Sequence, residues 1–404
     1  MSKTILIIGS FDTKGTEFGF VKELIENNGI NTLLMDTGVL GDPLITPDIP
    51  SGEVAKAGGT TLEGLRQKGD RGNAVDVMIK GVRQLVPDLF EKGKFDGVIS
   101  LGGGAGTNIA TAGMRELPVG VPKLMVSTLA SGDVSSFVDV KDITMMYSVV
   151  DIAGLNNLSK TILSNAAGAI CGMVRQTAPE SDSRPLIAAT MFGVTTPYVT
   201  TVREELAKSG YETVVFHATG SGGRAMEGLI KDGYFAAVAD VTTTEWCDEV
   251  VGGVLSAGPD RLEAAAKAGI PQVISVGALD MVNFHAMNTV PVKFKNRNLY
   301  KHNPTVTLMR TTPEECTEIG KRIAEKLNMS AAPVVLMLPL KGISALDLEG
   351  QPFYDSSANK ALFDSLKKHV TPNIQVVELD MHINDPEFGI ATARHLIDLL
   401  EQPP

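Results

Sequence analysis

Short runs of consecutive apolar residues alternate with amphipathic segments along the whole chain of 404 residues. Apolar residues at successive positions, as in ILII (Ile5–Ile8) and TLLM (Thr32–Met35), indicate strands that are buried on both faces. Such strands occur in parallel sheets, because their crossover helices cover the two faces. The sequence therefore predicts an α/β fold built from doubly wound, mainly parallel-sheet (Rossmann-like) domains.

The same alternation locates the elements of the first half. We expect strands at Thr4–Ile8, Thr32–Asp36, Gly97–Leu101, Lys123–Val126 and Thr144–Ser148, and helices at Glu17–Asn27, Asn73–Lys92, Thr107–Arg115 and Lys160–Gln176.

A polar segment with two prolines, Gln176–Pro185, predicts a linker between a domain of residues 1–180 and one of residues 185–404. After it the pattern restarts, with strands expected at Leu186–Met191, Thr213–His217, Ala236–Asp240, Gln272–Val276, Val334–Leu338 and Ile374–Leu379. Two doubly wound domains commonly face each other across a cleft, and we expect function there.

Composition disfavours several classes of partner. The net charge of −11 and pI near 5.1 disfavour general binding to nucleic acids or anionic membranes. No apolar run is long enough to cross a bilayer and the first residues lack a secretory pattern, so we expect a cytoplasmic protein. Cys171, Cys247 and Cys316 are far apart without a CxxC motif, which predicts buried thiols and disfavours a disulfide framework or a zinc site.

The segment after the first strand, GSFDTKG (Gly9–Gly15), carries the groups that a phosphate or Mg-phosphate ligand needs. Thr13 and backbone N–H groups at a helix start would hold phosphate oxygens, Lys14 would add charge, and Asp12 would hold a metal or a ribose hydroxyl. The segment is neither a GxGxxG nor a GxxxxGK[ST] motif. A capped helix with a solvent-facing lysine is the alternative.

A second candidate is the glycine run Gly102, Gly103, Gly104 and Gly106, followed by Thr107, after the third strand. Bare backbone amides at a helix start form an anion cradle, and we expect phosphate or nucleotide binding there. Tight packing of strand on helix is the alternative. Asp36 and Thr37 end the second strand, where an acid meets the ribose in dinucleotide folds, although an Asx turn explains them equally well.

In the second half, His217 ends a strand, Arg224 enters the following helix, and Glu245 follows the next strand. We expect these three residues to orient or activate a carboxylate or phosphate ligand. Asp248, Asp280 and His285 extend the set toward an acid–base pair or metal ligands, but no HExxH spacing favours a metal. The basic run Lys293–Pro304 would clamp an anion or be a solvated loop.

Several long motifs resemble the UPF0261 family and the N-terminal region of a plant tobamovirus-resistance protein. They are GSFDTKGTE, LGGGAGT, VSTLASGD, HATGSGGRAME, DVTTTEW and PLKGISALDLEGQPF, and together they span the chain. The resemblance implies a two-domain α/β architecture, ATP and Mg in the N-terminal domain, and a homodimer. It assigns ATP to Gly9, Asp12, Thr13, Lys14, Asp36, Thr37 and the loop Gly102–Thr107.

Three hypotheses follow for the activity. The first is an ATP-dependent ligase or kinase-like enzyme that acts on a small polar or anionic metabolite in the cleft between the domains. The second is a non-catalytic module that binds nucleotide or metabolite. The third is a lyase or hydrolase whose site lies in the C-terminal domain.

Overall fold

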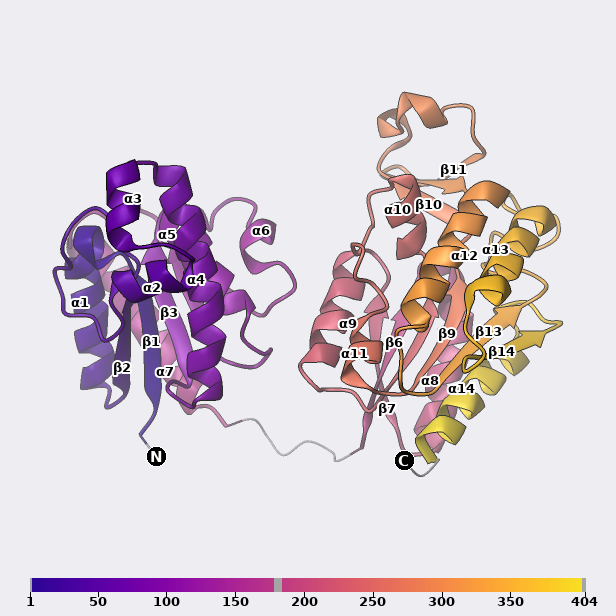
Figure 1. Cartoon of the computed structure of the whole chain (residues 1–404), viewed down its shortest axis with the longest axis horizontal. Coiled ribbons are helices and arrows are strands. Elements are labelled where there is room, and N and C mark those ends of the chain that lie inside the picture. The colour runs from indigo at the N-terminus through magenta and orange to yellow at the C-terminus, as the bar shows by residue number, and fades with distance from the viewer. Residues whose placement is uncertain (1, 178–183, 402–404) are drawn as a thin grey trace. The chain divides into compact units, whose positions relative to one another are not determined.

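A computed structural model describes residues 2–177 and 184–401, which form two compact units, Met1–Ser181 and Asp182–Pro404 (Figure 1). Both units are α/β, with a parallel sheet and helices on its two faces, as the sequence predicts. Residues 178–183 of the predicted linker lie outside the described residues.

The N-terminal domain holds a five-stranded parallel sheet in the order β2-β1-β3-β4-β5. Its strands are β1 (Thr4–Gly9), β2 (Asn31–Asp36), β3 (Gly97–Gly102), β4 (Lys123–Ser127) and β5 (Thr144–Tyr147). Its helices are α1 (Phe11–Asn27), α2 (Ser51–Ala57), α3 (Leu62–Lys68), α4 (Arg71–Glu91), α5 (Gly104–Arg115), α6 (Ser135–Val138) and α7 (Asn157–Arg175). The chain reverses its winding direction between β1 and β3, which is the switch point of this topology.

Strand β1 explains why consecutive apolar residues are needed. Ile5 and Ile7 pack with α1 and α7 in one buried cluster, whereas Leu6 and Ile8 pack with α2, α4 and α5 in another. Because successive side chains point to opposite faces, the run ILII fills both halves of the core.

The C-terminal domain repeats this plan with a six-stranded parallel sheet in the order β14-β13-β9-β8-β6-β7. Its strands are β6 (Leu186–Met191), β7 (Glu212–His217), β8 (Ala237–Thr242), β9 (Gln272–Gly277), β13 (Val334–Pro339) and β14 (Gln375–Leu379). Its helices are α8 (Thr196–Lys208), α9 (Ser221–Lys231), α10 (Glu245–Val251), α11 (Ala264–Ala268), α12 (Pro313–Leu327), α13 (Ser356–His369) and α14 (Pro386–Glu401). No helix of the described residues has the length and apolarity needed to cross a bilayer.

A small antiparallel sheet in the C-terminal domain was not predicted. It has the order β10-β12-β11, from β10 (Met281–Phe284), β11 (Leu299–Asn303) and β12 (Val306–Arg310). The basic run Lys293–Pro304 therefore contains a strand, whose last three residues are exposed. Its lysines and histidine masked the strand pattern, because an exposed edge strand carries few apolar residues.

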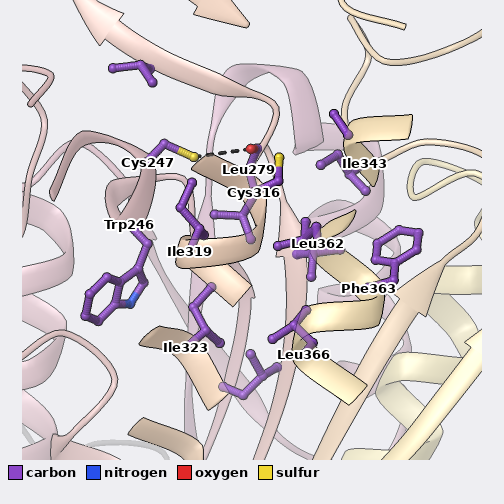
Figure 2. Close-up of a cluster of buried hydrophobic side chains, with 14 of the residues drawn as sticks. Trp246, Cys247, Leu279, Cys316, Ile319, Ile323, Ile343, Leu362, Phe363 and Leu366 are labelled. Atoms are coloured by element: carbon purple, nitrogen blue, oxygen red, sulfur yellow. Dashed lines mark hydrogen bonds between the residues drawn. The ribbon is translucent and has the colours of Figure 1, made fainter. Parts of the chain in front are cut away.

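All three cysteines are buried and unpaired, as predicted. Cys247 on α10 and Cys316 on α12 lie in one apolar cluster with Ile319 and Leu362, and the Cys247 thiol donates to the carbonyl of Leu279 at 3.3 Å (Figure 2). Burial raises the pKa of each of these two thiols, so both behave as small apolar side chains.

Candidate functional site

A cavity of about 630 Å³ opens at the switch point of the N-terminal domain. Adjacent strands β1 and β3 end there, and helices α1 and α5 begin there. The cavity is lined by residues that follow three of the strands and by the start of α4; they include Ser10, Asp12, Thr13, Lys14, Thr37, Arg71 and Gly102 to Gly106. In an open α/β sheet, this is the position where ligands bind.

The glycine run forms one wall of the cavity. Gly103 is the N-cap of α5 and provides no side chain to cap it, so the first N–H groups of the helix are left for a ligand or water. A Cβ on Gly102 would lie 3.0 Å from the Cα of Gly106, so Gly102 is needed for close packing. A Cβ on Gly104 would meet only Leu129, at 4.0 Å, so Gly104 leaves the wall bare.

Helix α1 begins at Phe11, earlier than predicted, and Lys14 has non-helical angles within it. The reason is Asp36 at the end of β2, whose carboxylate accepts from the N–H of Phe11 at 2.9 Å and of Gly38 at 2.8 Å. Asp36 is 1% exposed, and burial raises the pKa of its carboxyl group. The residue expected to bind a ribose therefore fixes the start of α1, and it does not line the cavity.

Asp12 lines the cavity but holds the backbone of its own domain. Its Oδ2 accepts from the N–H groups of Leu40 at 2.8 Å and Gly41 at 3.2 Å. Its Oδ1 points at Gly38, where a Cβ would lie 2.5 Å away. Arg66 donates to the carbonyls of Val39 and Gly41, both at 2.7 Å. Asp12 and Arg66 thus fix residues 38–41, which we call the strap, against the cavity.

Three groups on the cavity wall suit an anion. Thr13 is exposed, and Lys14 is half-buried and donates to the carbonyl of Ile152. Arg71 is exposed at the first position of α4, and its side chain forms no hydrogen bond or ion pair with any described residue. A cation there opposes the helix dipole, so its position is locally unfavourable and suits an anionic ligand.

Apolar side chains cover another part of the cavity wall. Val39 and Leu40 come from the strap, and the others are Leu65, Val75, Met78, Leu101 and Ile109. Leu40 is 86% exposed. Ligand pockets combine such apolar walls with a few placed polar groups.

The remaining predicted residues of this domain are mainly structural. A Cβ on Gly9 would lie 1.9 Å from the ring of Phe18, so Gly9 is needed for packing. Thr107 is buried and its hydroxyl bonds to that of Ser127 at 2.7 Å. Thr37 lines the cavity and its hydroxyl lies 3.4 Å from that of Ser10.

In the C-terminal domain, Glu245 is 1% exposed and already bonded. Its carboxylate accepts from the N–H groups of Gly220 at 2.7 Å and Gly223 at 3.1 Å, and from Arg261 Nε at 2.7 Å. His217 ends the edge strand β7 and is exposed; its ring lies tilted against that of Phe192, with the ring centroids 5.3 Å apart. Arg224 is exposed on α9. The action of His217, Arg224 and Glu245 on a second ligand stays a prediction. The hydrogen bonds of Glu245 give this residue a structural role.

Arg261 is the centre of the buried charges in this domain. It is 2% exposed and contacts Asp240, Glu245 and Glu227. Burial alone would lower its pKa, but Asp240 and Glu245 raise it well above the ordinary value for arginine. This cluster was not predicted, because the partners of Arg261 are distant from it in sequence.

Two further predicted carboxylates of the C-terminal domain are also buried. Burial raises the pKa of Asp248 to about 7, although Asn283 donates to it. Burial and the neighbouring Asp347 raise the pKa of Asp280, which accepts from the Ser344 hydroxyl at 2.7 Å. His285 is exposed. Among the described residues, no three His, Cys, Asp or Glu side chains are grouped to hold a metal ion.

Models of one protein family match both domains. The N-terminal domain model of the uncharacterised protein family UPF0261 matches residues 3–179, and the C-terminal domain model matches residues 184–400. The chain belongs to the UPF0261 family. A UPF0261 protein of Clostridium tetani is 57% identical over 404 residues, covering 100% of both chains. One of Rhizobium meliloti is 48% identical, covering 98% of this chain and 99% of the relative.

A UPF0261-like region also occurs in a longer plant protein. The tomato ToMV resistance protein Tm-1(GCR237) is 40% identical over 421 residues, covering 98% of this chain and 56% of that protein. Solved structures resemble the chain only loosely. A Streptomyces glycosyltransferase, SsfS6, complexed with thymidine diphosphate, covers 67% of this chain and 81% of its own at 15% identity and a TM-score of 0.22. A UDP-N-acetylglucosamine 2-epimerase of Rickettsia bellii covers 68% and 79% at 9% identity and a TM-score of 0.24.

Proposed function

We propose that the N-terminal domain binds ATP with Mg²⁺ in the cavity at its switch point. The observation that carries the proposal is that the first turns of α1 and α5 open onto one cavity, beside Lys14 and the unpaired Arg71. Helix N-termini and bare backbone amides attract phosphate oxygens, and the two cations add to that attraction.

The apolar side of the cavity suits the adenosine part of the ligand. Val39 and Leu40 on the strap and Val75 and Met78 on α4 line it. An aromatic base buried against such side chains gains hydrophobic stabilisation, while its polar edge reaches backbone groups. The strap would then contact the base, because Asp12 and Arg66 hold it at the cavity wall.

The oxygen donors of the cavity suit a magnesium ion that arrives on the phosphates. Such an ion keeps several waters and takes one or two protein oxygens besides those of the nucleotide. Thr13 and Asp151 line the cavity and would provide those oxygens. Asp12 does not fit this role, because both of its oxygens face the strap. The ion would neutralise phosphate charge.

The groups on the cavity wall bind and orient phosphates, and none of the described residues that line it is a histidine or cysteine. The proposal is therefore ATP binding, and a reaction with a small polar or anionic metabolite is its extension. Release of ADP or AMP when a metabolite pool is added would support an ATP-dependent enzyme. Binding without release would support a nucleotide-responsive module.

The experiment is isothermal titration of the full chain with ATP, with Mg²⁺ and with EDTA. Wild-type protein should bind ATP more tightly with Mg²⁺, and the Gly104→Ala variant should bind it about tenfold more weakly, equivalent to ~1.4 kcal/mol. The added methyl group would occupy the cradle, yet it meets only Leu129 at 4.0 Å, so the variant should fold.

Gly168→Ala is the matched control. Gly168 is exposed on α7 of the same domain, and an added Cβ would meet nothing within 4 Å. This control should bind ATP like the wild type and gain up to about 1 kcal/mol of stability from helix propensity. Equal ATP affinity of Gly104→Ala and Gly168→Ala, or no ATP binding by the wild type, would contradict the proposal.

A further inference from the structure

We infer that Glu17 is a positioning residue, which holds Lys14 in place at the phosphate end of the cavity through the segment 148–154. The inference rests on the proposed function, because it concerns how the same cavity recognises phosphate. Glu17 does not line the cavity. Any effect of Glu17 on ligand binding is therefore transmitted through other residues.

Two charged residues of α1 contact this segment. Glu17 is 3% exposed, and its carboxylate accepts from the N–H of Gly154 at 2.6 Å. Lys14 lies three residues earlier, at the position of α1 that has non-helical angles. Lys14 donates to the carbonyl of Ile152. The buried carboxylate thus anchors the stretch of backbone that receives the lysine.

The segment also contains a strained turn. Val149 has φ of 62°, a left-handed conformation that is a rare outlier for a β-branched residue. The N–H of Val150 donates to the carbonyl of Ser148 at 2.6 Å, which closes a three-residue γ-turn around Val149. Val149 is 56% exposed, so burial of its side chain does not compensate the strain. Strain of this kind persists where the surrounding structure holds it and clusters at ligand sites.

The turn directs the chain after β5 back toward α1. Asp151 then reaches the cavity wall, and the carbonyl of Ile152 reaches Lys14. An ammonium group has three donors, so a lysine with one donor on this carbonyl keeps two for phosphate oxygens. Fixing the lysine before binding reduces the entropy lost on binding. Without Glu17, the segment loses an anchor and the lysine loses its fixed partner.

The test compares a nucleotide with its phosphate part alone and its nucleoside part alone. Wild-type, Glu17→Ala, Glu17→Gln, Lys14→Met and the double variant Glu17→Ala/Lys14→Met are titrated with ATP, inorganic pyrophosphate and adenosine. Glu17→Ala should lose about tenfold in affinity for ATP and pyrophosphate, the size of one charge-assisted contact, and keep its affinity for adenosine. Glu17→Gln, which retains an acceptor for Gly154, should restore most of that loss. In the double variant, removing Glu17 should cost nothing beyond the loss caused by Lys14→Met.

A purely structural role would give a different pattern. Ile25→Val, a core change further along α1, is the matched control for lost stability and should leave all three affinities unchanged. Equal losses for ATP and adenosine in Glu17→Ala, unchanged ATP affinity, or additive losses in the double variant would overturn the inference while leaving ATP binding intact. A wild type that binds neither ATP nor pyrophosphate would overturn the proposed function and this inference with it.

Discussion

The two domains share one topology but treat the switch point differently. In the N-terminal domain, the ends of β1 and β3 border an open cavity and a helix without a side-chain cap. In the C-terminal domain, the equivalent strands are β6 and β8. The loop after β8, Thr243 and Thr244, is buried together with Glu245, the first residue of α10. The equivalent of the bare glycine run is a set of packed threonines and an acid.

The chain itself fills the second switch point. The hydroxyls of Thr195 and Thr242 lie 2.8 Å apart, and the carbonyl of Val194 accepts from the N–H of Ala345 and the side chain of Asn384, both at 3.0 Å. Loops that follow β13 and β14 thus close over the loop that follows β6. A shared fold therefore does not imply a shared site, since the residues at the strand ends decide whether a cavity remains.

The largest expected effect comes from removing Arg261, the cation of the buried cluster in the C-terminal domain. This change tests whether the charges near the filled switch point serve stability. Arg261→Met leaves Asp240, Glu245 and Glu227 without their shared partner. Breaking a buried ion pair in this way costs roughly 3–5 kcal/mol of unfolding free energy. Urea denaturation followed by the fluorescence of Trp246, the single tryptophan, reports on this domain. Arg203→Met, an exposed change on α8, is the control, and equal stability of the two variants would contradict the structural role.

The pH dependence of stability gives the next largest effect. The pKa of Asp248 is raised to about 7 in the folded protein, above its value in an unfolded chain. The folded state therefore holds this proton when the unfolded state has released it, so stability falls as pH rises from about 4 to about 7. Asp248→Asn carries no such proton. Relative to the wild type, it should gain about 3 kcal/mol of unfolding free energy between pH 5 and pH 8.

The surroundings of Asp248 make this variant a fair test. Asn283 donates to Asp248 through its backbone and side chain, while the Oδ1 of Asn283 is buried without a partner among the described residues. An exchange of the amide oxygen and nitrogen of Asn283 would provide an acceptor for the new amide. A difference between the variant and the wild type that stays constant from pH 5 to pH 8 would show that Asp248 is ionised throughout.

The sequence predicts the strands and the meeting of their loops better than the roles of single carboxylates. Runs such as ILII locate strand ends, and topology then brings Ser10 and Gly103 to one edge of the sheet. An aspartate looks the same in sequence whether it faces a ligand or a backbone N–H. The ligand roles of Asp36 and Asp12 therefore stay predictions, and the structure adds that Asp36 caps α1 and Asp12 holds the strap.

Other residues were missed because their partners are distant in sequence. Arg71 belongs to the cavity only because α4 crosses the face of the sheet near the ends of β1 and β3. Glu17 belongs to the site through Gly154, far along the chain. A charged residue at an unfavourable helix position, as Arg71 is, was the one local signal available.

Arg71→Met tests the open cavity of the N-terminal domain and has the smallest expected effect on stability. Removing the unpaired cation should weaken ATP binding by about tenfold, the size of one charge-assisted contact. The same change should raise the unfolding free energy by roughly 0.3–1 kcal/mol, since a cation at a helix N-terminus opposes the dipole.

The control is Lys80→Met, which removes the same charge. Lys80 lies outside the cavity on α4, is exposed, and forms no ion pair with the described residues. This variant should leave ATP affinity unchanged in isothermal titration. Equal weakening by the two variants would reduce the role of Arg71 to long-range attraction, whereas a loss confined to Arg71→Met at 0.15 M salt would assign it to direct contact, because exposed charges are screened beyond ~8 Å.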